Sequence, residues 1–318
     1  MKRSELVDAA VEIAEEYAGD GFKLTLRQLY YQLVARGLSP NGQKYYTRLG
    51  NALGDARLGG ACRVDIVEDR GRSVRSGYYT AFYHDVEEAL ATAADEVHEL
   101  PLTHLHVHPW YGQRIHVSVW VEKDALAGVF EPVCNKLGVG WFPCKGYPSI
   151  SSLLEYLNHL KDAQAAHPGP DGFDAAVVLY FGDHDPDGME IPQSADRTLL
   201  RLINEARGAP HADEVPFIEF VRVALTKEQI DKYKPVPFPA KITSSRFPKY
   251  VRDTGLRDAW ELDALDPKIL QALINKEVSS RFDRSTYDAY KTVIDDARAS
   301  MRLRMEDPEW IAGALAGD

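Results

Sequence analysis

The segment Ala175–Ile191 constrains the fold more than any other part of this 318-residue chain. Its first seven residues, through Phe181, are apolar without alternation, which is typical of a strand buried on both faces of a parallel sheet. Gly182 and three carboxylates follow at once: Asp183, Asp185 and Asp187. Because open α/β sheets place ligands at the carboxyl ends of their strands, the sequence predicts an oxygen-donor site here, suited to Mg²⁺ or Ca²⁺. The alternative is an acidic turn, since Asp, Pro and Gly are ordinary turn residues.

A second acidic position follows another apolar strand. The predicted strand Ile115–Val121 ends in Glu122 and Lys123. If the two strands are neighbours, Glu122 converges with Asp183 and Asp185, and crowded carboxylates favour a cation among them. The sequence therefore predicts Mg²⁺, with Mn²⁺ as a substitute, and Asp187 and Lys123 as additional ligands or supporting groups. The alternative is an edge glutamate that pairs with Lys123 or another base.

The spacing of apolar segments after residue 114 predicts the fold class. Strands at 115–121, 139–142, 175–181 and 217–225 alternate with helices at 125–137, 150–163 and 193–206. Strands and helices that alternate at this spacing form right-handed βαβ units on a mainly parallel sheet. The expected class is α/β, with helices continuing after the last strand.

The first eighty residues predict a separate helical domain. Helices are expected at 4–18, from a capping box at Thr25 and Gln28 to Gly37, and at 43–58, followed by a strand at 62–67 and a basic loop. This order is that of a winged helix, whose third helix enters a DNA groove, although a structural three-helix domain fits too. The expected organisation is a winged-helix domain over 1–80, a helical connector over 81–114 and an α/β domain over 115–318.

Charge restricts how the chain could meet nucleic acid. The formal net charge of −11 argues against a protein that coats nucleic acid nonspecifically. Residues 41–75, however, hold seven basic side chains against four acidic ones, and this reversal is a candidate phosphate-facing surface. Solvated arginines are the alternative. The expected DNA contacts are Lys44, Arg48 and Arg57 on the third helix and Arg70 and Arg72 in the loop.

Other protein classes are disfavoured by composition. Hydrophobic content of 45% and charged content of 27% are ordinary for globular proteins, and no apolar run is long enough to span a membrane. The amino terminus lacks the apolar core of a signal peptide, and three scattered cysteines suit neither a disulfide framework nor a Cys₄ zinc site. We therefore expect a cytoplasmic protein. The alternating His104, His106 and His108 are more consistent with packing or surface histidines than with a metal site.

The two acidic motifs together resemble a TOPRIM domain, the Mg²⁺-binding module of topoisomerases, bacterial-type primases and several nucleases. Four further segments resemble the A subunit of topoisomerase VI and its meiotic break-forming relatives. They are Val121–Ala125, Lys145–Pro148, Arg222–Ile230 and Trp260–Leu265. With gaps, the resemblance extends over residues 20–275.

The resemblance implies a winged-helix domain joined to a Rossmann-like TOPRIM domain, and a nucleophilic tyrosine. The family motif of Arg, two residues and Tyr-Tyr matches Arg27 to Tyr31, which puts Tyr31 at the nucleophile position. Attack by Tyr31 on double-stranded DNA would leave a 5′-phosphotyrosyl bond, with Arg27 one helical turn away facing the same phosphate. Glu122, Asp183 and Asp185 would hold Mg²⁺. The tyrosine of one protomer works with the metal of the other in this family, so a homodimer is implied.

Tyr31 also has a structural interpretation, because one tyrosine of the pair could complete the core of its amphipathic helix. Helical spacing from Leu26 places Tyr30 on the apolar face and leaves Tyr31 the more solvent-facing of the two.

The chain departs from the family at three points. No Walker A motif occurs, so we expect no nucleotide cofactor here, and strand passage would need an ATPase partner subunit. The longer amino-terminal region of the family is expected to be absent, and the Thr-Arg pair after Lys145–Pro148 is missing. Two other functions stay open: a metal-dependent hydrolytic nuclease, as in topoisomerase VI-like subunits of plasmid-defence systems, and a noncatalytic DNA-binding scaffold.

Overall fold

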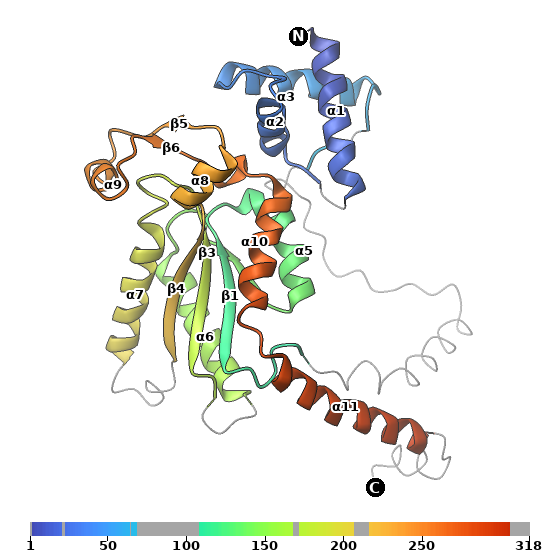
Figure 1. Ribbon diagram of the computed structural model, residues 1–318, viewed down its shortest axis with the longest axis vertical. Coiled ribbons are helices and arrows are strands. Elements are labelled where there is room, and N and C mark those ends of the chain that lie inside the picture. Colours follow the sequence, from blue (N-terminus) through green and yellow to red (C-terminus); the bar gives the residue numbers. More distant parts are fainter. Residues whose placement is uncertain are drawn as a thin grey trace. The chain divides into compact units, whose positions relative to one another are not determined.

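The computed structural model describes residues 2–20, 23–63, 65–68, 108–167, 172–206 and 216–305 (Figure 1). The chain divides into two compact units. The first comprises Met1–Ser73, Arg114–Ala166 and Asp171–Arg281, and the second comprises Val74–Gln113, His167–Pro170 and Phe282–Asp318. Helix α11 (Arg284–Met305) belongs to the second unit. Among the described residues, no helix has the length and apolar character needed to cross a membrane.

A four-stranded parallel sheet lies at the centre of the first unit. Its strands are β1 (Ile115–Val121), β2 (Gly140–Pro143), β3 (Ala175–Phe181) and β4 (Phe217–Ala224), in the spatial order β2-β1-β3-β4. Every neighbouring pair in this sheet is parallel, and Val121 lies opposite Phe181 in the register of β1 and β3. The predicted α/β class and parallel sheet are confirmed, and the two strands that precede the acidic motifs are neighbours.

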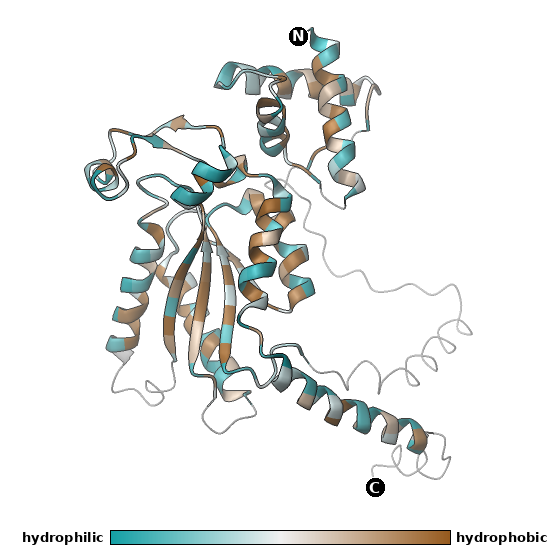
Figure 2. Ribbon diagram, in the orientation of Figure 1, coloured by the Kyte–Doolittle hydropathy of each residue, from teal (hydrophilic) through white to brown (hydrophobic). Residues whose placement is uncertain are grey.

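Helices cover both faces of the sheet because the strand side chains alternate between them. Trp120, Val178 and Tyr180 pack in one apolar cluster with α6 (Ile150–Ala165) and α7 (Ile191–Ala206). On the opposite face, the ring of Phe181 lies 5.0 Å from that of Phe130 in α5 (Ala127–Leu137). Helix α10 (Pro267–Ser279) packs against α5 (Figure 1). Figure 2 shows the strands mainly apolar and these helices apolar along one side.

Three helices precede the sheet in the chain. They are α1 (Arg3–Gly19), α2 (Leu26–Ala35) and α3 (Gln43–Leu58), packed around a common apolar core. The predicted capping box of α2 is confirmed, because Thr25 Oγ1 accepts the amide of Gln28 and the Gln28 side chain accepts the amide of Thr25. The winged-helix assignment itself stays a prediction.

The predicted strand over residues 62–67 is wrong for the part that the structure describes. Residues 62, 63 and 65–67 form bends and a turn, and only Glu68 makes a single parallel bridge, to Thr25. The Gly-rich turn before Cys62 and the Asp65 side chain, which bonds to Arg63 and Lys23, replace a strand ladder. Arg70, Arg72, His104 and His106 lie outside the described residues, as does the connector up to residue 107.

The chain after β4 returns to the carboxyl end of the sheet. Helix α8 (Lys227–Tyr233) is followed by a two-stranded ribbon of β5 (Phe238–Pro239) and β6 (Asp258–Ala259), with α9 (Phe247–Thr254) between these strands. The short helix η4 (Leu262–Ala264) then leads into α10. A backbone bridge between His184 and Trp260 fixes this return, so residues 260–264 lie beside the acidic loop that follows β3.

Candidate active site

Glu122 and Asp183 adjoin at the carboxyl edge of the sheet. The Glu122 amide donates to the carbonyl of Phe181 at 2.8 Å, which continues the β1–β3 pairing by one residue. The Asp183 amide then donates to Glu122 Oε2 at 2.9 Å. The sequence predicted that the two acidic motifs converge if their strands are neighbours. Strands β1 and β3 are neighbours, and Glu122 and Asp183 therefore lie side by side.

The loop after Asp183 is a turn rather than an extended segment. Asp185 Oδ1 accepts the amides of Asp187 and Gly188, at 3.0 and 2.5 Å, which folds the loop back toward Glu122. The Asp187 carboxylate accepts a hydrogen bond from Arg246 Nη1 at 2.9 Å. Residues 185–188 therefore form the acidic turn that was the alternative interpretation of this motif. Asp183 lies outside the turn, beside Glu122.

The backbone at residue 188 passes so close to Asp183 and Glu122 that only glycine fits there. A Cβ at residue 188 would lie 2.4 Å from the carbonyl oxygen of Asp183 and 2.9 Å from Glu122 Oε2. Arg222 of β4 braces the same loop, because its guanidinium donates to the carbonyls of Gly182 at 3.1 Å and Gly188 at 2.9 Å. Burial lowers the pKa of Arg222.

Lys123 occupies the centre of an acidic cluster that sequence analysis identified only in part. Its Nζ lies 2.8 Å from Asp183 Oδ2, 3.1 Å from Glu261 Oε2 and 3.2 Å from Asp263 Oδ1. Glu261 and Asp263 were not predicted as site residues. They occur in the segment Trp260–Leu265, whose resemblance to the topoisomerase VI A subunit implied no role for either side chain.

The backbone explains why Glu261 and Asp263 reach this cluster. After the bridge between His184 and Trp260, the Leu262 amide donates to Asp183 Oδ1 at 2.8 Å. Leu262 is fully buried, while the side chains at 261 and 263 both bond to Lys123. The contact joins residues that are 138 and 140 positions apart in sequence, so local patterns could not predict it.

Burial and mutual repulsion shift the protonation of these carboxyl groups. Burial, together with the charges of Asp183 and Asp185, raises the pKa of Glu122 to about 7. Burial also raises the pKa of Asp263, to about 6, although Lys123 opposes that shift. Burial alone would lower the pKa of Lys123, but Asp263, Asp183 and Glu261 outweigh it and raise that pKa. The cluster therefore holds Lys123 as a cation, while Glu122 and Asp263 ionise less readily than ordinary carboxyl groups.

Tyr31 joins the same cluster from helix α2. Its hydroxyl donates to Glu261 Oε2 at 2.9 Å and accepts from Arg27 Nε at 3.4 Å. Arg27 also pairs with Glu261 and with Asp263, the latter at 3.4 Å. Tyr31 is thus linked to Asp183 through two side chains, Glu261 and Lys123.

The expectation that Tyr31 is more solvent-facing than Tyr30 is wrong. Tyr31 is 2% exposed and Tyr30 is 4% exposed. Helical spacing considers only α2, but two residues from distant segments cover Tyr31. Glu261 accepts a hydrogen bond from its hydroxyl, and the ring centroid of Phe238 lies 5.8 Å from that of Tyr31. Burial and the charge of Asp263 raise the pKa of Tyr31, and Arg27 partly opposes this.

The donor set is chemically suited to an oxygen-preferring divalent cation. Glu122 adjoins Asp183, and burial together with the charges of Asp183 and Asp185 raises the pKa of Glu122, a cost that a bound cation would relieve. In the described part of the chain, however, no three Asp, Glu, His or Cys side chains are grouped so that they could hold a metal ion. Lys123 contributes the positive charge in this arrangement, so a metal at Asp183 would have to displace it.

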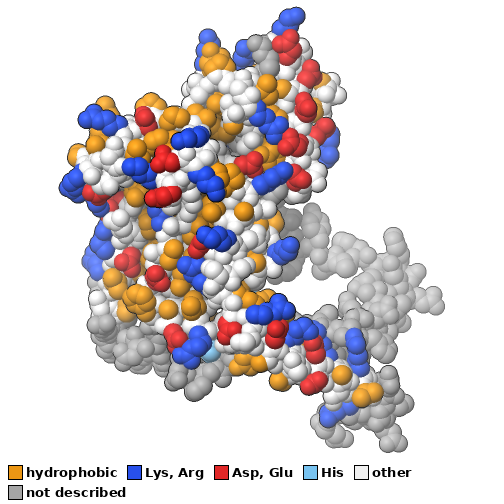
Figure 3. All heavy atoms as spheres, in the orientation of Figure 1, with side chains coloured by type: hydrophobic (Ala, Val, Ile, Leu, Met, Phe, Trp, Pro, Cys, Tyr) orange, Lys and Arg blue, Asp and Glu red, His pale blue; other side chains and the backbone are white. Residues whose placement is uncertain are grey.

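The predicted DNA contacts on α3 do not share one face. Lys44 and Arg48 are four residues apart and exposed, so they lie on one side of the helix. Arg57 follows Arg48 by nine residues, which places it half a helical turn away. On the face drawn in Figure 3, Lys and Arg side chains lie among Asp and Glu side chains.

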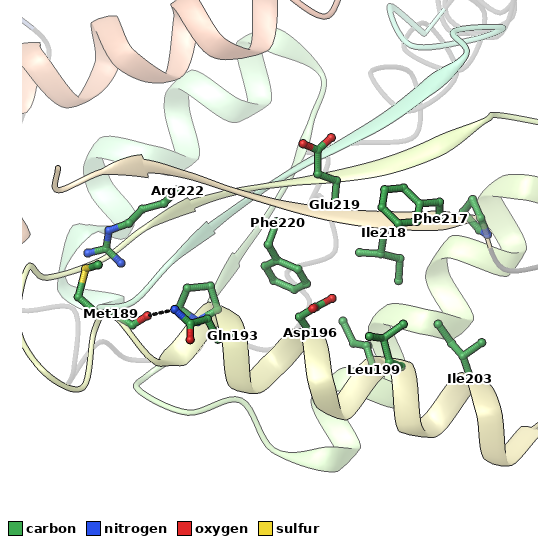
Figure 4. Close-up of a pocket in the computed structure, with 13 residues that line it drawn as sticks. Met189, Gln193, Asp196, Leu199, Ile203, Phe217, Ile218, Glu219, Phe220 and Arg222 are labelled. Carbon is green, nitrogen blue, oxygen red and sulfur yellow. Dashed lines mark hydrogen bonds between the residues drawn. The ribbon is translucent and has the colours of Figure 1, made fainter. Parts of the chain in front are cut away.

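A cavity of about 620 Å³ lies between α7 and the edge strand β4. Figure 4 shows Ile218 and Phe220 of β4 pointing toward α7, which carries Leu199 and Ile203. Its lining is mainly apolar and contains none of the predicted site residues. We therefore place the candidate active site at the carboxyl edge of the sheet.

The comparisons with known proteins do not add to this geometry. The chain matches no protein-family model, and a search of curated proteins finds no significant match.

Proposed function

We propose that this protein is a DNA-cleaving enzyme of the topoisomerase VI A-subunit type, with a winged-helix domain and a TOPRIM domain. The observation that carries the proposal is the link from Tyr31 through Glu261 and Lys123 to Asp183. Tyr31 and Asp183 are about 150 residues apart in the sequence, and they meet in one hydrogen-bonded cluster. Double-stranded DNA is the proposed substrate.

Each residue of the cluster has a role in a transesterification. The Tyr31 oxygen attacks phosphorus, its proton passes to Glu261, and the 3′-oxygen of the broken strand leaves and takes up a proton. Arg27 lies beside the Tyr31 oxygen and would stabilise negative charge on it and on the phosphate. The products are a 5′-phosphotyrosyl end and a free 3′-hydroxyl.

Glu122, Asp183 and Asp185 are the proposed ligands of Mg²⁺ or Mn²⁺. When bound, such a cation supplies positive charge to the phosphate and leaving oxygens. Lys123 holds Asp183 and Glu261 in place, and its Nζ could also contact the phosphate once it moves away from Asp183.

The homodimer implied by the resemblance remains part of the proposal. In that family the tyrosine acts at the partner's metal site, whereas Tyr31 here bonds to Glu261 of its own chain. Cleavage at a partner site would therefore require α2 to release Glu261. A regulatory or ATPase partner subunit is a second proposed partner, because the chain itself has no Walker A motif.

A hydrolytic nuclease is the second candidate function. The burial and raised pKa of Tyr31 favour it, because a buried phenol beside Asp263 and Glu261 is a poor nucleophile in this arrangement. The same carboxylates would then serve a water molecule as the attacking group. A noncatalytic scaffold would instead keep Lys123 as the permanent counter-charge of the cluster.

A plasmid cleavage assay separates these functions. The protein is incubated with supercoiled plasmid and Mg²⁺ or Mn²⁺, and stopped samples are split between detergent alone and detergent with protease. Tyr31→Phe and Asp183→Asn are compared with Tyr45→Phe and Asp174→Asn. These controls change a tyrosine and an aspartate outside the cluster; Asp174 pairs with Arg114 instead.

The transesterase predicts protein attached to 5′ ends, lost by at least about 10²-fold in both test variants and retained in both controls. Free ends that survive Tyr31→Phe but not Asp183→Asn would identify a hydrolytic nuclease. Retained DNA binding without cleavage under every metal condition would favour the scaffold.

A further inference from the structure

A second cavity, of about 220 Å³, opens beside Tyr31 and is not used by the cluster described above. Its walls come from three segments that are distant in sequence: α2, the start of α3 with the loop before it, and strand β5. The side chains that define it are Arg27, Tyr30, Tyr31, Gln43, Tyr46 and Phe238. Four of these six are aromatic.

The walls of this cavity are held by specific contacts. The Tyr30 hydroxyl accepts the amide of Gly42 at 2.7 Å and lies 3.1 Å from the Pro40 carbonyl, so it fixes the loop before α3. The ring centroids of Tyr30 and Tyr46 are 5.5 Å apart, edge to face. Asn41 Nδ2 donates to the carbonyl of Pro237 at 3.4 Å, which links the loop to β5.

The lining combines the three kinds of group that recognise a nucleotide. Aromatic rings stack on a planar base, and the exposed amide side chain of Gln43 can donate to or accept from a base edge. The Arg27 guanidinium lies at the same wall, and it also pairs with Glu261 and Asp263. The N-cap residue Gly42 provides no side-chain cap, so the first backbone N–H groups of this 16-residue helix also face anions favourably.

The geometry points to a binding site for a single unstacked nucleotide in this cavity, with its base between Tyr46 and Phe238 and its 5′-phosphate toward Arg27 and Tyr31. This inference rests on the proposed function for the identity of that nucleotide. Since Tyr31 lines the cavity and would become bonded to the 5′-phosphate, the bound nucleotide is the first one on the 3′ side of the break.

Photocrosslinking with a short single-stranded oligonucleotide tests this site. Its first nucleotide is 5-iododeoxyuridine, and 5′-phosphorylated and 5′-hydroxyl forms are compared on the full chain in EDTA, so that no cleavage is measured. Mass spectrometry of the digested product locates the crosslink. We expect it at Tyr46, Phe238 or Tyr30, with a higher yield from the phosphorylated form.

Variants add a second measurement, oligonucleotide binding, to this test. Phe238→Ala should weaken oligonucleotide binding about fivefold or more. Gln43→Ala, at an exposed position, should alter the order of preference among the four bases at the first nucleotide. Phe217→Ala removes an exposed ring of β4 and serves as the matched control, with no effect expected.

Crosslinks outside the cavity, or an equal yield in Phe238→Ala and Phe217→Ala, would overturn the site. Because EDTA is present, the two proposals fail separately. A crosslink in the cavity together with Tyr31-independent plasmid cleavage would remove the transesterase and leave the nucleotide site. Tyr31-linked DNA with the crosslink elsewhere would remove the nucleotide site alone.

Discussion

Among single residues, Lys123 is the one that compensates the negative charge of the candidate active site. Its ammonium group lies within 3.2 Å of carboxylate oxygens of Asp183, Glu261 and Asp263, and 21% of its side chain is exposed. Removing one member of a buried ion cluster leaves its partners charged and without compensation, which costs more than the cluster contributes when intact. Loss of the Lys123 charge should therefore lower the free energy of unfolding more than loss of an exposed ion pair does.

Lys123→Met is expected to destabilise the protein by about 2–4 kcal/mol at pH 8, measured by urea unfolding with EDTA present. Lys145→Met is the matched control. Its Nζ lies 3.1 Å from Asp124, but both side chains are substantially exposed, so a loss below about 1 kcal/mol is expected. Equal losses in the two variants would show that Lys123 does not compensate buried charge.

Glu122 gives the site a pH dependence whose sign follows from its raised pKa. The folded-state pKa of about 7 exceeds the unfolded value, so the folded protein binds the proton more tightly. The associated stability is present below about pH 4.5 and is lost as the pH rises toward 7.

Without metal, the melting temperature should therefore fall between pH 5 and pH 8, and Glu122→Gln should flatten that fall because an amide does not titrate. Added Mg²⁺ should raise the wild-type melting temperature more at pH 8 than at pH 5. If Glu122→Gln shows the same decrease of melting temperature with pH as the wild type, Glu122 is not the cause of that decrease.

The loop between β3 and α7 is the element that assembles the site. Asp185 bonds to the amides of Asp187 and Gly188, and Arg222 bonds to the carbonyls of Gly182 and Gly188. These contacts bring the Gly188 backbone against Glu122 Oε2, in a space that a side chain would fill. The loop can therefore be tested at a single glycine.

Gly188→Ala is expected to destabilise the protein by about 1–3 kcal/mol, because the new methyl group would meet the backbone oxygen of Asp183. Gly54→Ala is the matched control: it lies within helix α3, and nothing lies within 4 Å of its new methyl group. It should stabilise the protein by about 0.5–1 kcal/mol. Thermal denaturation of both variants measures this difference, and a stable Gly188→Ala protein would show that the loop can shift.

The first unit of the molecule connects the amino-terminal helices to the sheet through side-chain hydrogen bonds. Tyr17 of α1 donates to Asp266 Oδ2 at 2.6 Å, and Tyr31 of α2 donates to Glu261 Oε2 at 2.9 Å. Both acceptors lie in the segment that joins the ribbon to α10. The helices and the sheet should therefore respond together to changes in this segment.

A double-mutant cycle of Tyr31→Phe and Glu261→Gln measures that connection. We expect a coupling free energy of about 1–2 kcal/mol from urea unfolding, because the acceptor is charged and the bond is shielded from water. The cycle of Tyr45→Phe with Glu261→Gln should give no coupling. Additive effects in the first cycle would mean that α2 does not bond to Glu261 in solution.

The sequence by itself determined the strands, most helices and the two acidic motifs, because these depend on local patterns. The apolar runs before Glu122 and Asp183 predicted β1 and β3 within the bounds observed, and Thr25 and Gln28 predicted the start of α2. Tertiary structure decided which side chains surround those acids. Glu261 and Asp263 reach Lys123 only through a bridge between His184 and Trp260, and the same segment covers Tyr31. Contacts between residues more than a hundred positions apart depend on the folded path of the chain, which no local periodicity encodes.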